Sequence, residues 1–315
     1  MTQRVVLAAD VGGTNIRTAV VDEKGGIHAR HRWQAELHRL HTTSADEAAD
    51  QVLHALEESF RPLMDTPDIA AVGIGFPGFF RGDSGELASS PNLPGLLDFP
   101  LASRLQAMLG LPVHVHNDAL AACLGEFRFG AGRGLSHLMH ATLGTGVGGG
   151  VIIDHVPYAG EGGMSMEFGH LRVVDQDQPD ARHCGCGGRG CLETYASASA
   201  VAARFAEASG RKGITPIEIH ELAGKGDALA RKILEDAGSY LGQAIAEAAK
   251  LLDIRTMTVG GGLSLAWEWL YPPLMRRLEE RVIPPHRGQI RVLQSTLKDD
   301  AGLLGAAALA LDPRP

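Results

Sequence analysis

Short apolar runs alternate with helical patterns along this chain, and clusters of glycine end several of the runs. The β-branched run Val5 to Ala9 leads to Asp10, the glycine-containing turn Val11 to Asn15, and a second apolar run from Ile16 to Val21. Apolar runs of this length, bounded by turn residues, are typical of buried strands. The chain is therefore predicted to open with a strand, a glycine turn and a strand.

The opening pattern returns in the middle of the chain. A strand is predicted from His137 to Leu143, a turn over Gly144 to Gly150, and a strand from Val151 to Asp154. A third glycine cluster, Gly260 to Leu263, follows a predicted strand from Arg255 to Val259. Two halves that each open in this way indicate a duplicated, two-lobed α/β fold with a nucleotide between the lobes.

The other segments predict helices and further strands by their periodicity and by the proline and glycine residues that end them. Further strands are expected at residues 27–33, 69–76, 113–116 and 290–294. Helices are expected at residues 44–60, 101–109, 118–129, 198–208, 216–225, 228–252 and 301–311, with one more after Leu263. We expect residues 1–117, joined by the C-terminal helix at about 300–315, to form a small lobe, and residues 118–299 to form a large lobe.

Composition and charge limit the possible partners. The chain has 315 residues, of which 44% are hydrophobic, which is enough for ordinary domain cores. Its formal charge is −8 without a concentrated basic run, which argues against nucleic acid and anionic membrane as large partners and favours a small ligand. The first residues lack the features of a signal peptide, and no apolar segment approaches bilayer length, so we expect a cytoplasmic protein.

Three of the four cysteines lie in one glycine-rich run. Glycine lets such a backbone bring Cys184, Cys186 and Cys191 to one point, and an odd number of clustered thiols argues against disulfide pairing. Zinc prefers four nitrogen or sulfur ligands, and His170 can supply the fourth from the other side of the loop. His183 competes, but it adjoins Cys184, and neighbouring side chains in a short loop seldom reach one ion. The run predicts a closed structural zinc site; a glycine turn with buried cysteines is the alternative.

Two glutamates flank the predicted metal loop. Glu167 lies three residues before His170, and Glu193 lies two residues after Cys191. Fixing the loop with a metal would fix both carboxylates, and such a pair can accept hydrogen bonds from several hydroxyls of one polyol. The alternative is a pair of ordinary surface glutamates.

The first glycine turn suits a phosphate group. Glycines allow a backbone to approach an anion and aim its N–H groups at it, Asp10 can hold Mg²⁺ through water, and Thr14 can donate a hydroxyl. A plain hairpin is the alternative. Gly144, Gly146 and Gly149 match the spacing of a dinucleotide-binding motif, but the predicted strand that follows stands where that motif needs a helix, so we reject it. The sequence contains no P-loop motif.

Asp118 stands where a predicted strand becomes a predicted helix. A carboxylate at this place stays ionised beside the helix-start N–H groups, and the sheet-end loops of α/β proteins are where sites are built. The residue is therefore equally well explained as a functional base or as a helix N-cap. Asn92 lies in a polar, proline-containing loop long enough to line a cleft, and it is a further candidate contact.

Several motifs occur in the order found in the ROK family of sugar kinases and repressors, and the resemblance spans nearly the whole chain. They are Asp10–Arg17, Gly75–Gly78, Asn117–Asp118, Thr142–Gly150, Glu167–His170 and Cys184–Glu193. The cysteine run and the Glu-Phe-Gly-His motif look most like those of bacterial ROK glucokinases.

This resemblance implies an actin-like, ribonuclease-H-like α/β fold that closes around a hexose and ATP, with Asp118 as the general base. It also implies that His170 binds zinc through one ring nitrogen and faces the sugar with the other. The implied sugar contacts are Gly78, Asn117, Asp118, Glu167, His170 and Glu193. The implied nucleotide contacts are Asp10, Gly12, Gly13, Thr14, Asn15, Gly144, Thr145, Gly146, Gly260, Gly261 and Gly262.

The implied activity is ATP-dependent phosphorylation of a hexose, with Mg²⁺ accompanying ATP and glucose as the leading substrate. The alternatives within the kinases are N-acetylglucosamine, N-acetylmannosamine, allose and fructose, because discrimination depends on pocket shape. One departure from the family pattern is Met166, where many members carry glycine or alanine. A sugar-responsive repressor would need a winged helix-turn-helix ahead of the first strand, which we do not expect here. We expect a homodimer or homotetramer.

Overall fold

The computed structural model describes residues 4–37, 44–82, 84–91 and 93–312. The chain divides into two compact units, and β9 (Val147–Ile153) carries it from the second unit into the first. The first unit comprises residues 1–136, 150–165 and 299–315, and the second comprises residues 137–149 and 166–298. The lobe boundary expected at residue 117 falls within the first unit, because the helix that begins at Asp118 packs there against the C-terminal helix.

A five-stranded sheet with the order β3-β2-β1-β4-β7 forms the frame of the first unit. β1 and β2 form the expected hairpin, β2 and β3 are also antiparallel, and β1, β4 and β7 run parallel. The strands are β1 (Val5–Val11), β2 (Asn15–Asp22), β3 (Ile27–Gln34), β4 (Ile69–Phe76) and β7 (Val113–Asn117). The parallel pairing brings the carboxyl ends of β1, β4 and β7 to one edge of the sheet, where α/β proteins place their ligands.

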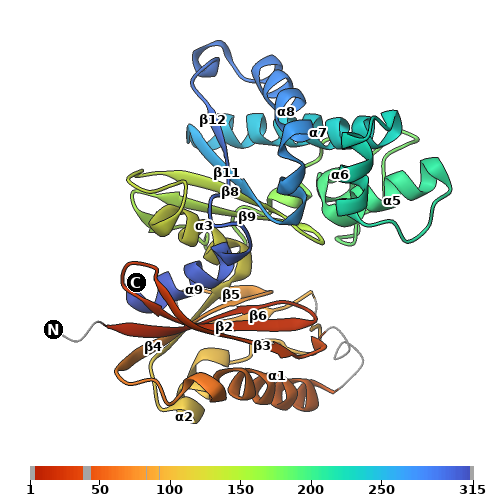
Figure 1. Cartoon of the computed structure of the whole chain (residues 1–315). Coiled ribbons are helices and arrows are strands. Elements are labelled where there is room, and N and C mark those ends of the chain that lie inside the picture. Colours follow the sequence, from red (N-terminus) through yellow and green to blue (C-terminus); the bar gives the residue numbers. More distant parts are fainter. Residues whose placement is uncertain (1–3, 38–43, 83, 92, 313–315) are drawn as a thin grey trace. The chain divides into compact units, whose positions relative to one another are not determined.

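Helices cover both faces of this sheet, with α1 and α2 on one face and α9 on the other (Figure 1). The helices are α1 (Ala45–Phe60), α2 (Leu101–Leu109), α3 (Asp118–Phe129) and α9 (Ala301–Leu311), with the short 3-10 helices η2 (Arg61–Leu63) and η6 (Lys298–Asp300). The apolar side chains Val52, Leu56 and Phe60 recur at helical spacing on α1 and are fully buried. They join Leu7 of β1 in the main apolar cluster of this unit. The Ser44 hydroxyl accepts a hydrogen bond from the Glu47 N–H and caps the start of α1.

Glycines allow α9 and α3 to approach at backbone distance. A Cβ at Gly305 would lie 1.6 Å from the carbonyl oxygen of Ala121, and a Cβ at Gly125 would lie 2.2 Å from the carbonyl oxygen of Ala301. No side chain can occupy such a contact without moving a helix. The C-terminal helix is therefore fixed to the helix that begins at Asp118.

We expect Gly305→Ala to lower the free energy of unfolding by about 3 kcal/mol or more, because the added methyl group meets a backbone carbonyl rather than a flexible side chain. The matched control is Gly224→Ala at the end of a helix in the second unit, where an added Cβ meets nothing within 4 Å. The control should be neutral or stabilising by about 0.5–1 kcal/mol, as Ala usually is in a helix. Urea denaturation of the two variants measures both changes. Equal stabilities would contradict the close approach of α3 and α9.

A second sheet has the order β10-β9-β8-β11-β12 and repeats the topology of the first, with antiparallel strands on one side and parallel strands on the other. The strands are β8 (Leu138–Leu143), β9 (Val147–Ile153), β10 (Val156–Pro157), β11 (Thr256–Gly260) and β12 (Arg291–Gln294). This repetition agrees with the duplication expected from the sequence.

The rest of the second unit combines helices with the irregular segment 171–192. Its helices are α4 (Glu193–Ala196), α5 (Ala198–Ser209), α6 (Pro216–Gly224), α7 (Ala228–Leu252) and α8 (Trp267–Arg281), with 3-10 helices η3 (Phe168–His170), η4 (Gly262–Ala266) and η5 (Pro284–His286). α7 and α8 lie side by side (Figure 1), and a Cβ at Gly238 or Gly242 of α7 would lie 2.2 Å from a carbonyl oxygen of α8. Among the described residues, no helix combines the length and the apolar character needed to span a bilayer.

Two details differ from the expectations drawn from the sequence. β9 begins at Val147, inside the glycine run, rather than at Val151, because these glycines serve close packing within a strand. A Cβ at Gly149, for example, would lie 2.5 Å from the carbonyl oxygen of Met166. In addition, a hairpin of β5 (Phe79–Arg81) and β6 (Glu86–Ser89), which was not predicted from the sequence, follows β4.

Candidate active site

Asp118 is the first residue of α3 and directly follows β7. β4 pairs with both β7 and β1, with Gly75 opposite both His116 and Asp10. A Cβ at Gly75 would lie 3.5 Å from the Asp118 Cα. The half-buried Asp118 carboxylate accepts a hydrogen bond from the Ala119 N–H at 2.9 Å. The parallel strands thus place this carboxylate at the edge of the sheet where a ligand is expected.

Asn117, and not Asp118, is the N-cap of α3. Its Oδ1 accepts hydrogen bonds from the N–H groups of Ala119 and Leu120, each at 3.0 Å. Its Nδ2 donates to the carbonyl oxygen of Gly78 at 3.1 Å and so ties the end of β7 to the turn after β4. Gly78 has no room for a side chain, because its Cβ would lie 2.4 Å from Leu87 Cδ1. The capping explanation of Asp118 is therefore wrong, and Asn117 holds the helix start that presents it.

Asp10, at the end of β1, is held from two sides. Its carboxylate forms an ion pair with Arg17, which is its direct partner across the β1–β2 hairpin. On the other side, a Cβ at Gly302 would lie 2.9 Å from Asp10 Cγ, so the carboxylate packs against the first turn of α9. Asp10 is thus an anchored, mostly buried carboxylate at the end of β1.

The turn between β1 and β2 is short and polar. The Gly12 N–H donates to the carbonyl oxygen of Asn15 at 2.9 Å and closes the turn. The Asn15 side chain donates to the Thr14 hydroxyl at 2.9 Å and accepts from Arg32 Nε at 3.0 Å. Gly12 and Thr14 are exposed, and the Arg32 guanidinium contacts Asn15 of the same turn. Positive charge next to a glycine turn suits a phosphate ligand.

The second glycine turn lies next to the third glycine cluster in the second unit. The Gly144 N–H donates to the carbonyl oxygen of Gly146 at 3.0 Å, which closes the turn between β8 and β9. β11 runs parallel to β8, and a Cβ at Gly261 would lie 2.5 Å from the carbonyl oxygen of Leu143. Gly261 also has a φ of +81°, a conformation that favours glycine. Gly144 to Gly146 and Gly260 to Gly262 thus form one glycine-lined edge.

Four side chains converge in the metal loop as expected. The ligand atoms of His170, Cys184, Cys186 and Cys191 all lie within 4.8 Å of one another. The sulfur atoms of Cys186 and Cys191 are 3.7 Å apart, and the Cys184 sulfur is 3.6 Å from His170 Nδ1. Tetrahedral zinc with its usual bond lengths places two thiolates about 3.8 Å apart, and a thiolate and an imidazole nitrogen about 3.6 Å apart. The donor set therefore fits zinc in both chemistry and size.

The two ring nitrogens of His170 face different groups. Nδ1 faces the cysteines, and Nε2 is 3.6 Å from a carboxylate oxygen of Glu167. Partial burial raises the pKa of Glu167, and the neighbouring Glu193 carboxylate adds to the rise, whereas His170 opposes it. Burial raises the pKa of the Cys191 thiol to about 12. The exposed His183 lies outside this group of four, whereas His170 belongs to it.

Comparison with known proteins gives the family. The model of the ROK family matches residues 6–313. The chain belongs to the ROK family. It is 32% identical over 324 residues to the glucokinase of Thermotoga maritima, with 98% of each chain covered. It is 31% identical over 310 residues to an N-acetylmannosamine kinase of Yersinia pestis, with 96% of this chain and 97% of that protein covered.

A solved relative supports the fold of this ROK chain. A ROK family glucokinase from Streptomyces griseus in complex with glucose and AMPPNP matches it with a TM-score of 0.80 and 34% sequence identity. The match covers 97% of this chain and 99% of that chain. The actin-like α/β fold class expected from the sequence is thereby confirmed.

Two arginines beside the first glycine turn of this ROK protein were not predicted from the sequence to belong to the site. Arg17 and Arg32 flank the first glycine turn, and neither was singled out. The signal was present in the hairpin, because strict antiparallel pairing places Arg17 opposite Asp10. The candidate contact Asn92 lies outside the described residues.

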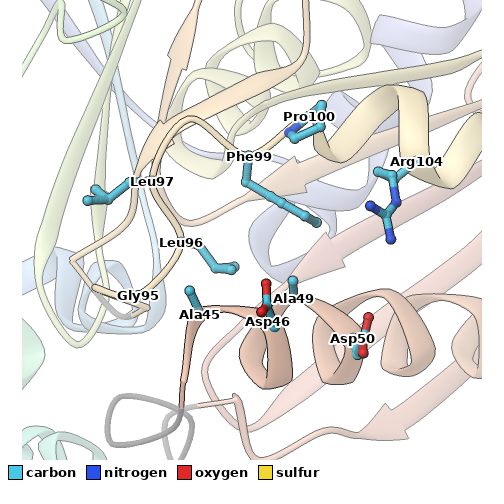
Figure 2. A pocket seen from close by; sticks show the side chains of 10 residues that line it. All are labelled: Ala45, Asp46, Ala49, Asp50, Gly95, Leu96, Leu97, Phe99, Pro100 and Arg104. Atoms are coloured by element: carbon cyan, nitrogen blue, oxygen red, sulfur yellow. The ribbon is translucent and has the colours of Figure 1, made fainter.

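The first unit of this ROK chain also contains a pocket of about 380 Å³, shown in Figure 2. It is formed by the start of α1 and by residues 95–104, with Asp46, Asp50 and Arg104 among its side chains. None of the residues predicted to contact sugar, nucleotide or metal lines it. The candidate active site is therefore defined by the motif residues and not by this pocket.

Proposed function

We propose that this ROK protein transfers the terminal phosphoryl group of ATP to a hexose, with glucose as the first candidate and the C6 hydroxyl as the acceptor. The observation that carries the proposal is the placement of Asp118. Its carboxylate stands at the carboxyl end of β7, while the neighbouring Asn117 caps the helix. Full-length similarity to proteins named glucokinase supports the same reaction.

Asp118 acts as the general base in this proposal. Phosphoryl transfer needs little covalent help from a protein, and positioning and charge neutralisation provide most of the acceleration. Asp118 accepts the proton of the attacking hydroxyl, and Asn117 with Gly78 holds the start of α3 in place. Glu167, His170 Nε2 and Glu193 are the proposed hydrogen-bonding partners of the sugar hydroxyls.

The glycine turns bind the nucleotide in this proposal. Gly12 to Asn15 and Gly144 to Gly146 hold phosphate groups, and Gly260 to Gly262 line the adenosine. Mg²⁺ bound with ATP would neutralise phosphate charge, and the anchored carboxylate of Asp10 would be a hard oxygen ligand that suits this ion. Arg17 keeps that carboxylate oriented.

Zinc is the proposed resident metal, held by His170 and the three cysteines of the metal loop. Four nitrogen and sulfur ligands leave no open position, so the ion has a structural role. A zinc ion here would fix the loop that carries Glu167 and Glu193, and His170 Nδ1 would be its nitrogen ligand, while Nε2 lies 3.6 Å from a Glu167 carboxylate oxygen.

A coupled ADP-release assay tests the function. Protein with zinc, ATP and Mg²⁺ is offered glucose, N-acetylglucosamine, N-acetylmannosamine, allose and fructose in turn. We expect sugar-dependent ADP release with the highest kcat/KM for glucose. N-Acetylmannosamine is the second candidate, because similarity to the Yersinia pestis kinase also covers nearly the whole chain. ADP release that is independent of every sugar would contradict the proposal.

Met166 is the residue through which we expect sugar selectivity to change. It is half-buried next to Glu167 and has a φ of +56°, which a residue with a side chain rarely adopts. Met166→Gly relieves this backbone strain and removes a long apolar side chain. We expect kcat/KM for N-acetylglucosamine to rise relative to that for glucose by a factor of about 10, as changes of apolar volume usually give.

The ratio of the two kcat/KM values in wild type and variant measures this effect. Met164→Ala is the matched control, because Met164 is exposed and its backbone is not left-handed. An unchanged ratio in Met166→Gly would show that Met166 serves packing and that the sugar is selected elsewhere.

A further inference from the structure

Glu193 touches both the metal loop and the second glycine turn. It is the first residue of α4, two positions after the metal ligand Cys191. Its Oε2 accepts a hydrogen bond from the Val147 N–H at 3.0 Å, and its Oε1 lies 3.9 Å from the sulfur of Cys184. Val147 is the first residue of β9, directly after the turn Gly144 to Gly146. One carboxylate therefore links elements that lie 46 residues apart in the sequence.

The glycine turn is shaped to accept this carboxylate. A Cβ at Gly146 would lie 2.3 Å from Glu193 Oε2, so only glycine allows the side chain to reach Val147. At the other end of the turn, the N–H of Ala198 donates to the carbonyl oxygen of Gly144 at 2.9 Å. Both ends of the turn are thus held by the short segment that follows the last cysteine.

The metal loop in turn fixes that segment. The Leu192 N–H donates to the carbonyl oxygen of Leu171 at 2.9 Å, next to the ligand His170. The Thr194 N–H donates to the carbonyl oxygen of Cys191 at 3.0 Å. A metal bound by His170 and the cysteines would hold together the two chain segments on which the position of Glu193 depends. Through its charge-assisted hydrogen bond to Val147, a fixed Glu193 would then restrict the motion of the Gly144–Gly146 turn.

We propose that Glu193 is a positioning residue through which the metal loop orders the Gly144–Gly146 turn, so that metal binding and nucleotide binding strengthen each other. The inference rests on the proposed function, because that function assigns this turn to the phosphates. Coupling of this kind is reciprocal: if metal raises the affinity for ADP by some factor, ADP raises the affinity for metal by the same factor. If Glu193 were only structural, its replacement would change the affinities for metal and for ADP, but through it neither ligand would change the affinity for the other.

The test that needs no nucleotide is amide hydrogen exchange at Val147 in zinc-loaded and metal-free protein. We expect metal removal to accelerate exchange at Val147 about 10-fold or more, while the amides of the central strand β11 stay protected and report that the unit is folded. In Gly146→Ala the Val147 amide should exchange quickly even with zinc bound, because the added methyl group displaces the flexible end of Glu193. Gly224→Ala is the control elsewhere in the second unit, since its Cβ meets nothing within 4 Å, and exchange at Val147 in that variant should match wild type.

Isothermal titration then measures the coupling itself. We expect Mg-ADP to bind zinc-loaded wild type at least about 5-fold more tightly than metal-free wild type, within the range usual for such coupling. In zinc-loaded Glu193→Gln, which keeps the side-chain shape but weakens the acceptor, ADP affinity should fall toward that of the metal-free protein. Val147 exchange or ADP affinity that does not respond to metal in wild type would overturn the proposal. Sugar-dependent ADP release would remain in that case, which separates this inference from the proposed function.

Discussion

Asp118→Asn is expected to lower kcat by at least ~10²-fold while sugar affinity and stability stay close to those of wild type. Removing a general base typically costs about 10²–10⁴-fold in rate. The asparagine side chain has nearly the same shape, and its oxygen can still accept the hydrogen bond from the Ala119 N–H that spans 2.9 Å. The start of α3 is therefore kept, and the loss falls on proton transfer.

Asn117→Ala is the matched control for this prediction. It removes the two cap hydrogen bonds to Ala119 and Leu120 and the link to Gly78, while leaving the Asp118 carboxylate in the sequence. Loss of such a cap typically costs about 0.5–2 kcal/mol of stability. The two variants should therefore separate, with the catalytic loss in Asp118→Asn and the larger loss of stability in Asn117→Ala. Near-normal kcat in Asp118→Asn would make Asp118 a helix-start residue only.

Removing the metal should have the second large effect. The purified protein should hold about one zinc per chain. Cys184→Ser or Cys191→Ser should lower zinc content and activity together by at least ~10-fold, because replacing even a residue that only supports a ligand typically lowers metal affinity or activity by about 10–100-fold. The reason is that, in the proposed function, zinc holds in place both glutamates that flank the loop. Chelation should abolish the activity, and added zinc should restore it. Metal analysis beside kcat in each variant checks the prediction.

His183→Ala provides the matched control for the metal. His183 is exposed and adjoins Cys184, but it is not one of the four converging side chains. Its replacement should leave the zinc content and kcat nearly unchanged. Full activity in a protein shown to be free of zinc would remove the structural role assigned to the ion.

Much of the fold follows from local patterns that the sequence displays. The apolar runs on both sides of Gly12 to Asn15 predicted β1 and β2, because a buried strand needs such a run and a tight reversal needs glycine. The convergence of three cysteines with His170 was predicted for a similar reason, since three thiols in a glycine-rich run are typical ligands of one metal ion. In both cases the residues that meet in space also stand close together in the sequence.

Contacts between distant segments left no such signal. The hydrogen bond between Glu193 and Val147 joins residues 46 positions apart, and only the fold shows that Gly146 is small to admit that carboxylate. The sequence also did not reveal that Asn117 rather than Asp118 caps α3, because either residue type can cap a helix. The left-handed backbone of Met166 could not be expected either, since methionine gives no hint of a positive φ.

Identification of the reaction product shows whether this protein transfers a phosphoryl group from ATP to glucose with the help of Asp118. Zinc-loaded protein is incubated with Mg-ATP and glucose, and the phosphorylated product is assigned by ³¹P and ¹H nuclear magnetic resonance. We expect one ADP per glucose 6-phosphate with wild type, and almost none of either product with Asp118→Asn under the same conditions. ADP that accumulates without any sugar phosphate, or equal product from the Asp118→Asn variant, would contradict the account.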